Sequence, residues 1–307
     1  MVPSGLPTSI ADPAETESAA DRCAVDAALF ALCDRSLGDL PATVADAIRY
    51  SLLGEGKRLR PLLVLGAYRA CGGAGDASAL AASVEIVHAY SLVHDDLPCM
   101  DDDDVRRGRP TTHRRHGTGV AAIAGVAMVP LAARAAGDAA LALGLPASSR
   151  SDIVRELMRA SGAAGMVGGQ LLDLAGEERV LSLAELERVH AAKTGALIAA
   201  SVRIGGIAAG ATTPQRDALE GFGAAIGLAF QIADDVLDAT ATTAQLGKTA
   251  GRDALLGKST YPALLGVDGA VARAGALADQ ARAALVTGGL LTPALSRLAQ
   301  FVVNRTS

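Results

Sequence analysis

Residues 77–104 read ASALAASVEIVHAYSLVHDDLPCMDDDD, and this stretch decides the fold. Its first part, Ala77–His94, carries apolar side chains at helical spacing, with almost none of the alternation typical of a half-buried strand. We therefore predict a long helix that runs directly into Asp95 and Asp96. An apolar helix that ends in a run of carboxylates is expected to deliver them from the core to a site.

A second acidic cluster ends another apolar stretch, because Pro214–Asp238 has helical spacing and closes with FQIADDVLD (230–238). Asp234 and Asp238 are four residues apart, so they share one helix face, where like charges repel. Mg²⁺ suits such carboxylates because it prefers hard oxygen ligands and takes others from substrate phosphates. Two clusters of this kind predict a magnesium site for a diphosphate, whereas a solvated acidic helix end is the alternative for either one alone.

The geometry of the first cluster leaves its second metal ligand open. Asp101 follows Asp95 by six residues and would not share its face on an ideal helix, whereas Asp102 follows by seven and would. Pro98 disrupts the helix between them, so spacing alone does not choose between the two.

Helical spacing continues along most of the 307 residues. Half of the chain is apolar, aromatic residues make up 3% and Trp is absent, so Ala, Leu and Val must fill the core. We expect an all-α fold with a flexible tail over residues 1–20 and one domain over residues 21–307, a helical bundle around a deep central cavity. The predicted helices are one around Leu29–Leu40, then Thr43–Leu53, Leu62–Cys71, Ala77–His94, Val120–Leu143, Asp152–Leu174, Leu183–Gly205, Pro214–Asp238 and two within Val271–Arg305.

Charge and cysteine usage argue against several classes of protein. The net charge of −5 argues against a nucleic-acid partner. The four cysteines form no CxxC pair, which argues against a zinc site or a disulfide framework and favours a cytoplasmic location. The N-terminus lacks the pattern of a signal peptide. Gly117–Ala133 is rich in Ala and Gly and contains Pro130, so we expect no membrane span there.

Basic segments alternate with the acidic clusters along the chain. GEGKRLRP (54–61) precedes a helix, RRGRP (106–110) follows the first cluster, and Lys193-Thr194 lies in an apolar helix. Lys248 and Lys258 follow the second cluster. Arg binds phosphate oxygens with two nitrogens and Lys acts as a point charge, so these segments favour a diphosphate ligand. None of them matches a nucleotide-binding loop.

Together, the segments resemble the trans-isoprenyl diphosphate synthases, the family of farnesyl and geranylgeranyl diphosphate synthases. The segments that carry the resemblance are GKRLRP (56–61), YSLVHDDLPCMDDDDVRRGRPTTH (90–113), GMVGGQLLDL (165–174), KTGALI (193–198), FQIADDVLD (230–238) and GKSTYPALLG (257–266). The resemblance implies an all-α isoprenoid-synthase-type bundle, usually a homodimer. It implies an enzyme that condenses isopentenyl diphosphate with dimethylallyl or geranyl diphosphate to give farnesyl diphosphate, with three Mg²⁺ ions around the diphosphate.

The resemblance also implies roles for individual residues. The metal ligands would be Asp95, Asp96, Asp101, Asp234, Asp235 and Asp238. The residues that hold isopentenyl diphosphate would be Lys57, Arg60, His88 and Arg107. The residues on the allylic side would be Arg106, Lys193, Thr194, Gln231, Lys248 and Lys258. Among these, Lys193, Arg106 and Arg107 would act most directly in catalysis, as cations beside the diphosphates.

Helical spacing places further polar residues near the two clusters. His88 lies two turns before Asp95, and Gln231 lies one turn before Asp234, so each faces its cluster. Alone, the histidine would be interpreted as a core residue. Gln170 and Asp173 are three residues apart in an apolar helix and either form a buried pair or line the site.

Product length is expected to depend on the residues just before Asp95. Tyr90 and Ser91 lie about one turn earlier, where the resemblance places the floor of the substrate pocket. A bulky ring there, with the insertion Pro98-Cys99, is similar to the farnesyl-type pattern, so we favour a C15 product over C20. The alternative is that Tyr90 is an ordinary core residue.

One position departs from the family pattern. Gly125-Val126 stands where the family usually has Gly-Asp, and Pro130 follows in the same predicted helix. We expect a buried polar contact to be lost or replaced there. The alternatives for function are a geranylgeranyl diphosphate synthase, a non-catalytic partner subunit, a metal phosphohydrolase and a class I terpene cyclase. Intact aspartates, the absence of a histidine cluster and the isopentenyl-side cations argue against the last three.

Overall fold

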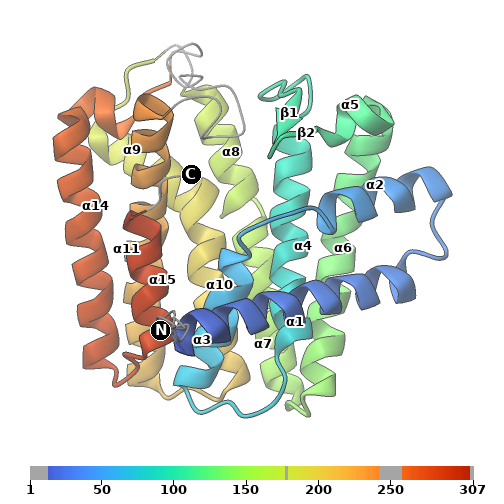
Figure 1. The fold of residues 1–307 in the computed structure, drawn as a ribbon, viewed down its shortest axis with the longest axis horizontal. Coiled ribbons are helices and arrows are strands. Elements are labelled where there is room, and N and C mark those ends of the chain that lie inside the picture. Colours follow the sequence, from blue (N-terminus) through green and yellow to red (C-terminus); the bar gives the residue numbers. More distant parts are fainter. Residues whose placement is uncertain (1–12, 177–178, 242–257, 305–307) are drawn as a thin grey trace, which may run out of the picture.

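The computed structural model describes residues 13–176, 179–241 and 258–304, and helices account for most of them (Figure 1). The helices are α1 (Pro13–Ser36), α2 (Ala42–Leu52), α3 (Leu59–Ala70), α4 (Ser78–Asp95), α5 (Thr112–His116), α6 (Thr118–Ala142), α7 (Ala147–Ser161), α8 (Met166–Ala175), α9 (Leu183–His190), the π-helix η1 (Ala191–Gly195), α10 (Ala196–Ala208), α11 (Thr213–Thr240), α14 (Tyr261–Thr287) and α15 (Pro293–Val303). Strands β1 (Val105–Arg106) and β2 (Arg109–Pro110) form the one hairpin in the described residues. The predicted all-α class is confirmed.

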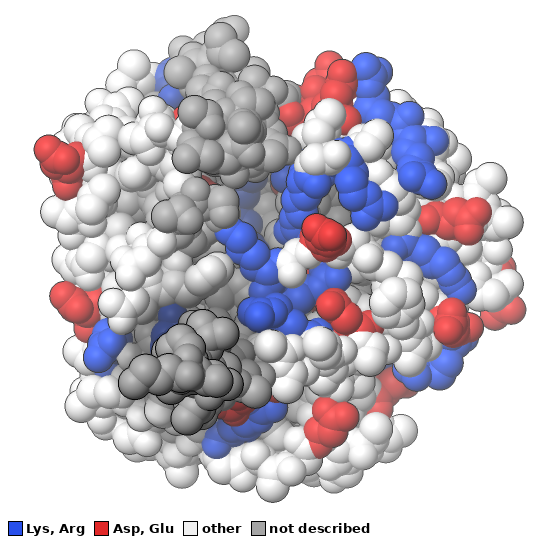
Figure 2. Space-filling view, viewed as in Figure 1, with Lys and Arg blue, Asp and Glu red and all other residues white. Residues whose placement is uncertain are grey.

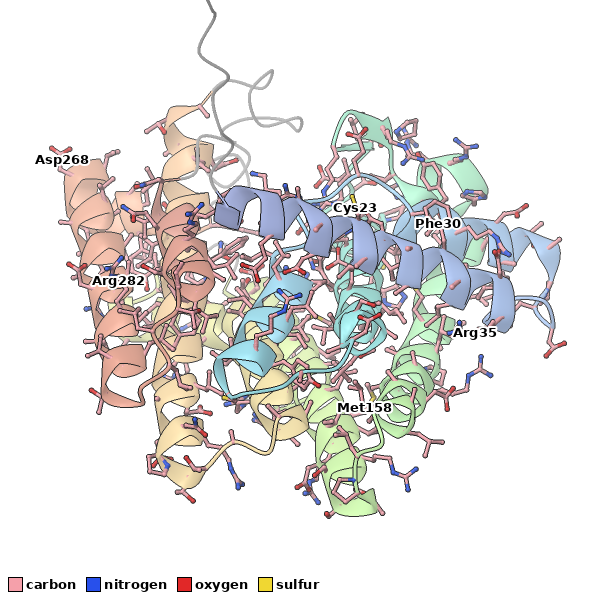
Figure 3. All side chains as sticks on the ribbon, turned by 60° about the horizontal axis from the view of Figure 1, so that its bottom comes forward. Cys23, Phe30, Arg35, Met158, Asp268 and Arg282 are labelled. Carbon is pink, nitrogen blue, oxygen red and sulfur yellow. The ribbon has the colours of Figure 1, made fainter. Side chains whose placement is uncertain are left out.

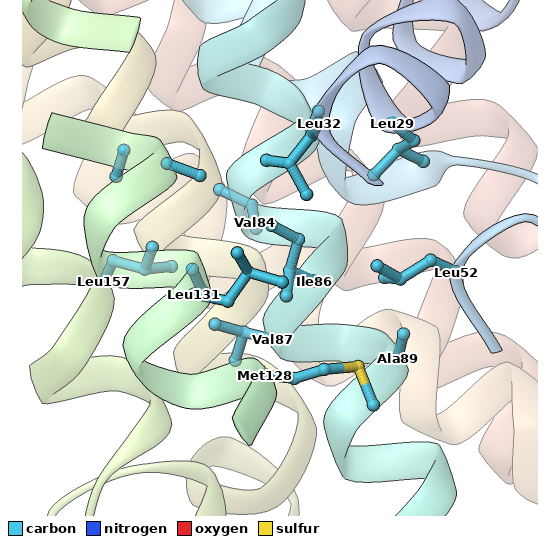
Figure 4. Close-up of a cluster of buried hydrophobic side chains, with 14 of the residues drawn as sticks. Leu29, Leu32, Leu52, Val84, Ile86, Val87, Ala89, Met128, Leu131 and Leu157 are labelled. Atoms are coloured by element: carbon cyan, nitrogen blue, oxygen red, sulfur yellow. The ribbon is translucent and has the colours of Figure 1, made fainter. Parts of the chain in front are cut away.

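Helix α4 lies at the centre of one half of the bundle because apolar side chains cover nearly all of its circumference. Val84, Ile86 and Val87 are each fully buried, and they meet side chains of α1, α2, α6 and α7 in one cluster (Figure 4). A helix that is apolar all round is stable only when neighbours cover every side of it. Its C-terminal end therefore has a fixed position in the bundle, and Asp95 is the last residue of that end.

A second cluster of buried side chains joins α11, α14 and α15 to α3 and α10. Phe222 and Tyr261 are fully buried within it. Small residues let these helices approach closely: a methyl group on Gly205 of α10 would lie 2.3 Å from the carbonyl oxygen of Val64 on α3. Helix α1 runs across the bundle, with Phe30 on its outer side (Figure 3).

The helix predicted over Asp152–Leu174 is wrong, because two helices, α7 and α8, occupy that range. The break falls between Gly162 and Gly165, where the backbone leaves helical geometry at both glycines. A methyl group on Gly165 would lie 2.2 Å from the carbonyl oxygen of Ala160, so only glycine permits this close turn. Apolar periodicity continued through the turn and concealed it.

Other boundaries also differ from the predictions. Helix α1 begins at Pro13, inside the range assigned to a flexible tail, and ends at Ser36, before Leu40. The C-terminal pair begins at Tyr261 rather than near Val271. The capping box at Ser182 and Glu185 is confirmed, and the helix predicted to follow it continues to Ala208 through the π-helix η1.

Helix α6 is, within the described residues, the one helix long and apolar enough to span a membrane by length and composition, with 44% of its most apolar window buried. Core helices of soluble proteins pass the same test, so the expectation of no membrane span stays a prediction. A surface pocket of about 550 Å³ lies between α6 and α7 and shares no lining residue with the acidic or basic clusters. The deep central cavity also stays a prediction.

Candidate active site

A compact turn brings Asp101 back to the end of α4. The backbone N–H of Asp101 donates to the carbonyl oxygen of Asp95 at 2.8 Å, and that of Met100 donates to Leu97 at 2.9 Å. The residues Pro98 and Cys99 lie inside this turn, which is why spacing on an ideal helix failed to place the second carboxylate. Loss of solvent around the Asp95 carboxyl raises its pKa, and the nearby charge of Asp101 raises it further.

Asp102 belongs to a different group of side chains. It has a left-handed backbone, with φ of 48°, and it is exposed. Oxygen and nitrogen atoms of Asp102, Asp104 and His113 lie within 4.8 Å of one another, on the hairpin side of the loop. The structure therefore brings Asp101, and not Asp102, toward Asp95.

Asp96 is held by the scaffold. Arg106 of β1 forms an ion pair with its carboxylate: Nε donates to Oδ1 at 2.8 Å and Nη2 donates to Oδ1 at 2.6 Å. Asp96 is buried, and adjacent residues on a helix point about 100° apart, so Asp95 and Asp96 face different surroundings. Arg106 also approaches Asp103 at 3.7 Å. The structure thus places Arg106 and Asp96 as a pair, whereas the resemblance assigned one to the diphosphate and the other to metal.

The π-helix η1 places Lys193 opposite the first acidic cluster. Lys193 Nζ donates to Asp173 Oδ2 at 2.6 Å, and burial opposes its charge, but Asp173, Asp95 and Asp101 outweigh burial and raise its pKa. Lys258 donates to the same Asp173 oxygen at 3.2 Å and to Asp101 at 3.3 Å. Asp173 therefore lines the site between two lysines. Of the two alternatives for Gln170 and Asp173, a buried pair or residues that line the site, the second holds for Asp173.

Close backbone packing fixes the position of η1. A methyl group on Gly169 of α8 would lie 2.1 Å from the backbone nitrogen of Lys193, and one on Gly227 of α11 would lie 2.7 Å from Cα of Gly195. π-helices are rare and are found often at functional sites. Here the extra residue per turn coincides with Lys193 and Thr194.

Thr194 links η1 to the second acidic cluster on α11. Its hydroxyl donates to Gln231 Oε1 at 2.8 Å, and Gln231 Nε2 donates to Asp235 Oδ1 at 3.0 Å. The backbone N–H of Tyr261 donates to the other oxygen of Asp235 at 3.1 Å, and His190 Nε2 lies 3.6 Å from it. Both oxygens of the buried Asp235 are therefore engaged by the scaffold, while the neighbouring Asp234 is half-buried.

Basic residues gather around His88 on α4. Burial lowers the pKa of His88 well below its ordinary value, and the charges of Arg60 and Arg107 lower it further. A neutral imidazole beside several cations is a hydrogen-bonding group for an anion that those cations attract. On the face shown in Figure 2, Lys and Arg side chains form a band from the hairpin end toward the middle of the molecule.

Tyr90 lies one turn before His94 on α4, and their rings meet edge to face with centroids 4.9 Å apart. His94 Nε2 lies 3.1 Å from the carbonyl oxygen of Ala122. The ring packs against Gly125, where a methyl group would lie 2.2 Å from His94 Nε2. Ser91 donates back to the carbonyl oxygen of His88.

At Val126, where a buried polar contact is expected to be lost or replaced, the structure has an exposed residue. Its side chain is 63% exposed on the outer face of α6, and Gly125 is the residue that packs against α4. The helix also continues through Pro130 without a break.

Some residues of the site were not predicted from the sequence, and one predicted residue lies outside the part of the chain that the structure describes. Lys248 lies outside the described residues. The contacts of Arg58 and His190 and the position of Asp173 between two lysines were not predicted, although the polar pair Gln170 and Asp173 in an apolar helix was a usable signal for the last. The structure brings together Asp95, Asp101, Lys193 and Lys258, with Thr194 and Gln231 joining them to α11.

The fold and the site define an all-helical enzyme with carboxylates and cations on facing elements, and comparisons with known proteins agree. A family model described as polyprenyl synthetase matches residues 41–282. Farnesyl diphosphate synthase of Escherichia coli (strain K12) is 46% identical over 270 residues, which are 85% of this chain and 89% of that protein. The chain therefore belongs to the polyprenyl synthetase family and is a trans-prenyltransferase.

Two further relatives show the breadth of the family. Geranylgeranyl pyrophosphate synthase 9, chloroplastic, of Arabidopsis thaliana is 44% identical over 234 residues, which are 75% of this chain and 64% of that protein. Among solved structures, a geranyltransferase from Helicobacter pylori, complexed with magnesium and isoprenyl diphosphate, has a TM-score of 0.80 at 29% identity. That similarity covers 96% of this chain and 98% of that one.

Proposed function

We propose that this chain condenses isopentenyl diphosphate with dimethylallyl or geranyl diphosphate and releases farnesyl diphosphate. The observation that carries the proposal is the meeting of Asp95, Asp101, Lys193 and Lys258 in one network. Identity to a farnesyl diphosphate synthase over most of both chains supports the product.

The carboxylates fit magnesium. Asp95 and Asp101 of the first cluster and Asp234 of the second offer hard oxygen ligands, and Asp95 is a half-buried carboxyl with an acidic neighbour and a raised pKa. We infer three Mg²⁺ ions held by these residues. Mg²⁺ held by these carboxylates would neutralise charge on the diphosphate and so favour its departure from the allylic carbon.

The cations of the chain act on the diphosphates directly. Lys193 and Lys258 are paired with Asp173 and Asp101, and an arriving diphosphate offers them stronger acceptors. Preorganised cations stabilise the charge that develops on the leaving diphosphate. On the other side, Lys57, Arg60, Arg107 and neutral His88 would hold isopentenyl diphosphate while its double bond attacks. The proton lost afterwards goes to the released diphosphate.

An elongation assay tests this function. Purified protein would be incubated with Mg²⁺, labelled isopentenyl diphosphate and either dimethylallyl or geranyl diphosphate, and the product alcohols separated by chromatography. Farnesol from both primers is the expected result. Cyclised hydrocarbon formed without isopentenyl diphosphate would identify a terpene cyclase, and no product from either primer would identify a non-catalytic subunit.

Tyr90 sets the product length in this proposal. Its ring lies beside His94, about one helical turn before Asp95 in the sequence. Tyr90→Ala should therefore open space at the end of the pocket that the growing chain reaches. We expect the main product to lengthen from C15 to C20 or beyond. Chromatography of the product alcohols checks this, with Tyr90→Phe as the control because it keeps the ring and should keep the C15 product. An unchanged product would show that another residue closes the pocket.

Magnesium affinity should depend on pH through Asp95. Burial, with help from Asp101, raises the pKa of Asp95 from 3.8 to about 6, so protons compete with metal below that pH. Each unit below pH 6 should weaken Mg²⁺ binding by up to about tenfold. The metal-free protein should behave oppositely, since a raised carboxyl pKa means that stability increases as pH falls from about 6 toward 4.

Melting temperatures with and without Mg²⁺ at pH 8 and pH 5 measure both effects. The increase caused by Mg²⁺ should be large at pH 8 and small at pH 5, and Asp95→Asn should remove this difference. An equal increase at both pH values would place the metal on carboxylates other than Asp95.

We further propose that the chain forms a homodimer through α6 and that it acts in the cytoplasm. Ile123, Val126 and Leu141 of α6 are each more than half exposed, and apolar surface of this kind favours an interface. All four cysteines are free thiols, which suits a reducing compartment. Sedimentation of the wild type and Val126→Asp tests the dimer: conversion to monomer supports this face, and an unchanged dimer refutes it.

A further inference from the structure

Arg58 is a buried arginine between two residues assigned to isopentenyl diphosphate. It is 6% exposed, it precedes α3, and its backbone is left-handed with φ of 51°. This conformation is unfavourable for a residue with a side chain and persists only where its surroundings enforce it. Lys57 is its neighbour before, and Arg60 lies two residues after it.

The Arg58 guanidinium ties the loop to three helices. Nε donates to Asp26 on α1 at 2.8 Å, and Nη1 donates to Glu85 on α4 at 2.9 Å. Nη2 donates to the carbonyl oxygens of Leu52 at 3.3 Å and Gly54 at 2.8 Å. All three nitrogens are engaged, so the side chain has one orientation, and the loop from residue 53 to 58 folds around it.

A contribution to folding stability does not explain well why Arg58 and Glu85 form a buried pair. Both side chains are about 95% buried, at 5% and 4% exposure. Removing two charges from water is costly, and apolar residues of similar volume often replace such pairs without loss of stability. A buried pair that also bonds a loop backbone is better explained by the conformation that it specifies.

A second arginine holds the same loop from outside. Arg107 Nη1 donates to the carbonyl oxygen of Glu55 at 2.7 Å. Gly56 lies between the two arginines, since a methyl group there would lie 2.8 Å from Arg107 Nη1 and 3.2 Å from Arg58 Nη1. The loop that carries Lys57 is therefore fixed from both sides, and glycine is the residue that leaves room for both guanidiniums.

We propose that Arg58, with Glu85, is a positioning residue that fixes Lys57 and Arg60 for isopentenyl diphosphate. It does not touch the substrate. The inference rests on the proposed function, because it assumes that this loop binds the homoallylic substrate. Loss of Arg58 should therefore weaken binding of isopentenyl diphosphate, while the allylic diphosphate, which binds the lysines near Asp173, should be affected little.

The test uses a double variant that keeps the core filled, Arg58→Met with Glu85→Leu. We expect KM for isopentenyl diphosphate to rise about 10- to 100-fold, because small misplacements of binding groups cost that much. KM for geranyl diphosphate should stay near wild type, whereas the melting temperature should fall because the carbonyl oxygens of Leu52 and Gly54 lose their donor. Arg69→Gln is the matched control, since Arg69 also joins α3 to α1, through Asp21, but lies far from the loop.

A second variant guards against misfolding of the first. Asp26→Ala removes one half-exposed partner and keeps the buried pair, so KM for isopentenyl diphosphate should rise a few-fold. Unchanged KM values in both variants, or equal increases for both substrates, would overturn the proposal. Failure of the wild type to elongate any primer would instead refute the proposed function, so the two failures are distinguishable.

Discussion

Asp95→Asn should lower kcat by about three orders of magnitude, a loss typical of removing a main electrostatic contributor to catalysis. Asn keeps the shape of the side chain but lacks the negative charge that metal requires. Asp95 is the last residue of a helix fixed by the core, so a neighbouring carboxylate does not take its place. Steady-state rates with isopentenyl and geranyl diphosphates at saturating concentration measure the change.

The same substitution makes an opposite prediction for stability. The pKa of Asp95 is raised to about 6, so its charge is unfavourable in the metal-free protein at pH 8. The variant should then melt at or above the wild-type temperature without metal and gain less from added Mg²⁺. Asp102→Asn is the matched control, because Asn tolerates a left-handed backbone and Asp102 faces away from Asp95. A large loss of kcat in Asp102→Asn, with little loss in Asp95→Asn, would show that the metal binds at Asp102 and not at Asp95.

Gly169→Ala should lower kcat by about a hundredfold, as expected when a catalytic group is displaced by about 1 Å. The new methyl group would lie 2.1 Å from the backbone nitrogen of Lys193 and 2.4 Å from its Cα, so η1 must shift. Backbone cannot move aside as a flexible side chain can, and the melting temperature should also fall. Rates and thermal unfolding of the variant measure both effects.

Gly275→Ala provides the control for this substitution. It lies within helix α14 and a methyl group there meets nothing within 4 Å, so the change should keep activity and slightly raise stability. Wild-type activity in Gly169→Ala would show that the position of η1 is adjustable and that Lys193 does not depend on it.

The main elements of the fold were predictable because period and composition act locally. The apolar stretch before Asp95 and the one before Asp238 are helices α4 and α11, and each ends in its acidic cluster. What the sequence left open depends on contacts between distant segments. The break between α7 and α8 exists because glycines permit close backbone contact, and an apolar period does not record that contact.

The site shows the same division. Both clusters were identified, but the second aspartate of each pair is engaged by the scaffold: Asp96 by Arg106, and Asp235 by Gln231 and the Tyr261 backbone. Adjacent residues on a helix cannot both face one ligand, so one aspartate of each pair was expected to point elsewhere. Its partner comes from another element, and the sequence does not indicate which residue that is. Asp101 was ambiguous for a related reason, since a tertiary turn, and not a helix, returns it to Asp95.

A crystal structure with Mg²⁺ and a non-ionising thiodiphosphate analogue of geranyl diphosphate tests the central claim most directly. We expect one diphosphate between α4 and α11, contacted by Lys193 and Lys258 and joined through metal to Asp95, Asp101 and Asp234. Metal bound instead among Asp102, Asp104 and His113, or a diphosphate that contacts neither lysine, would contradict this account.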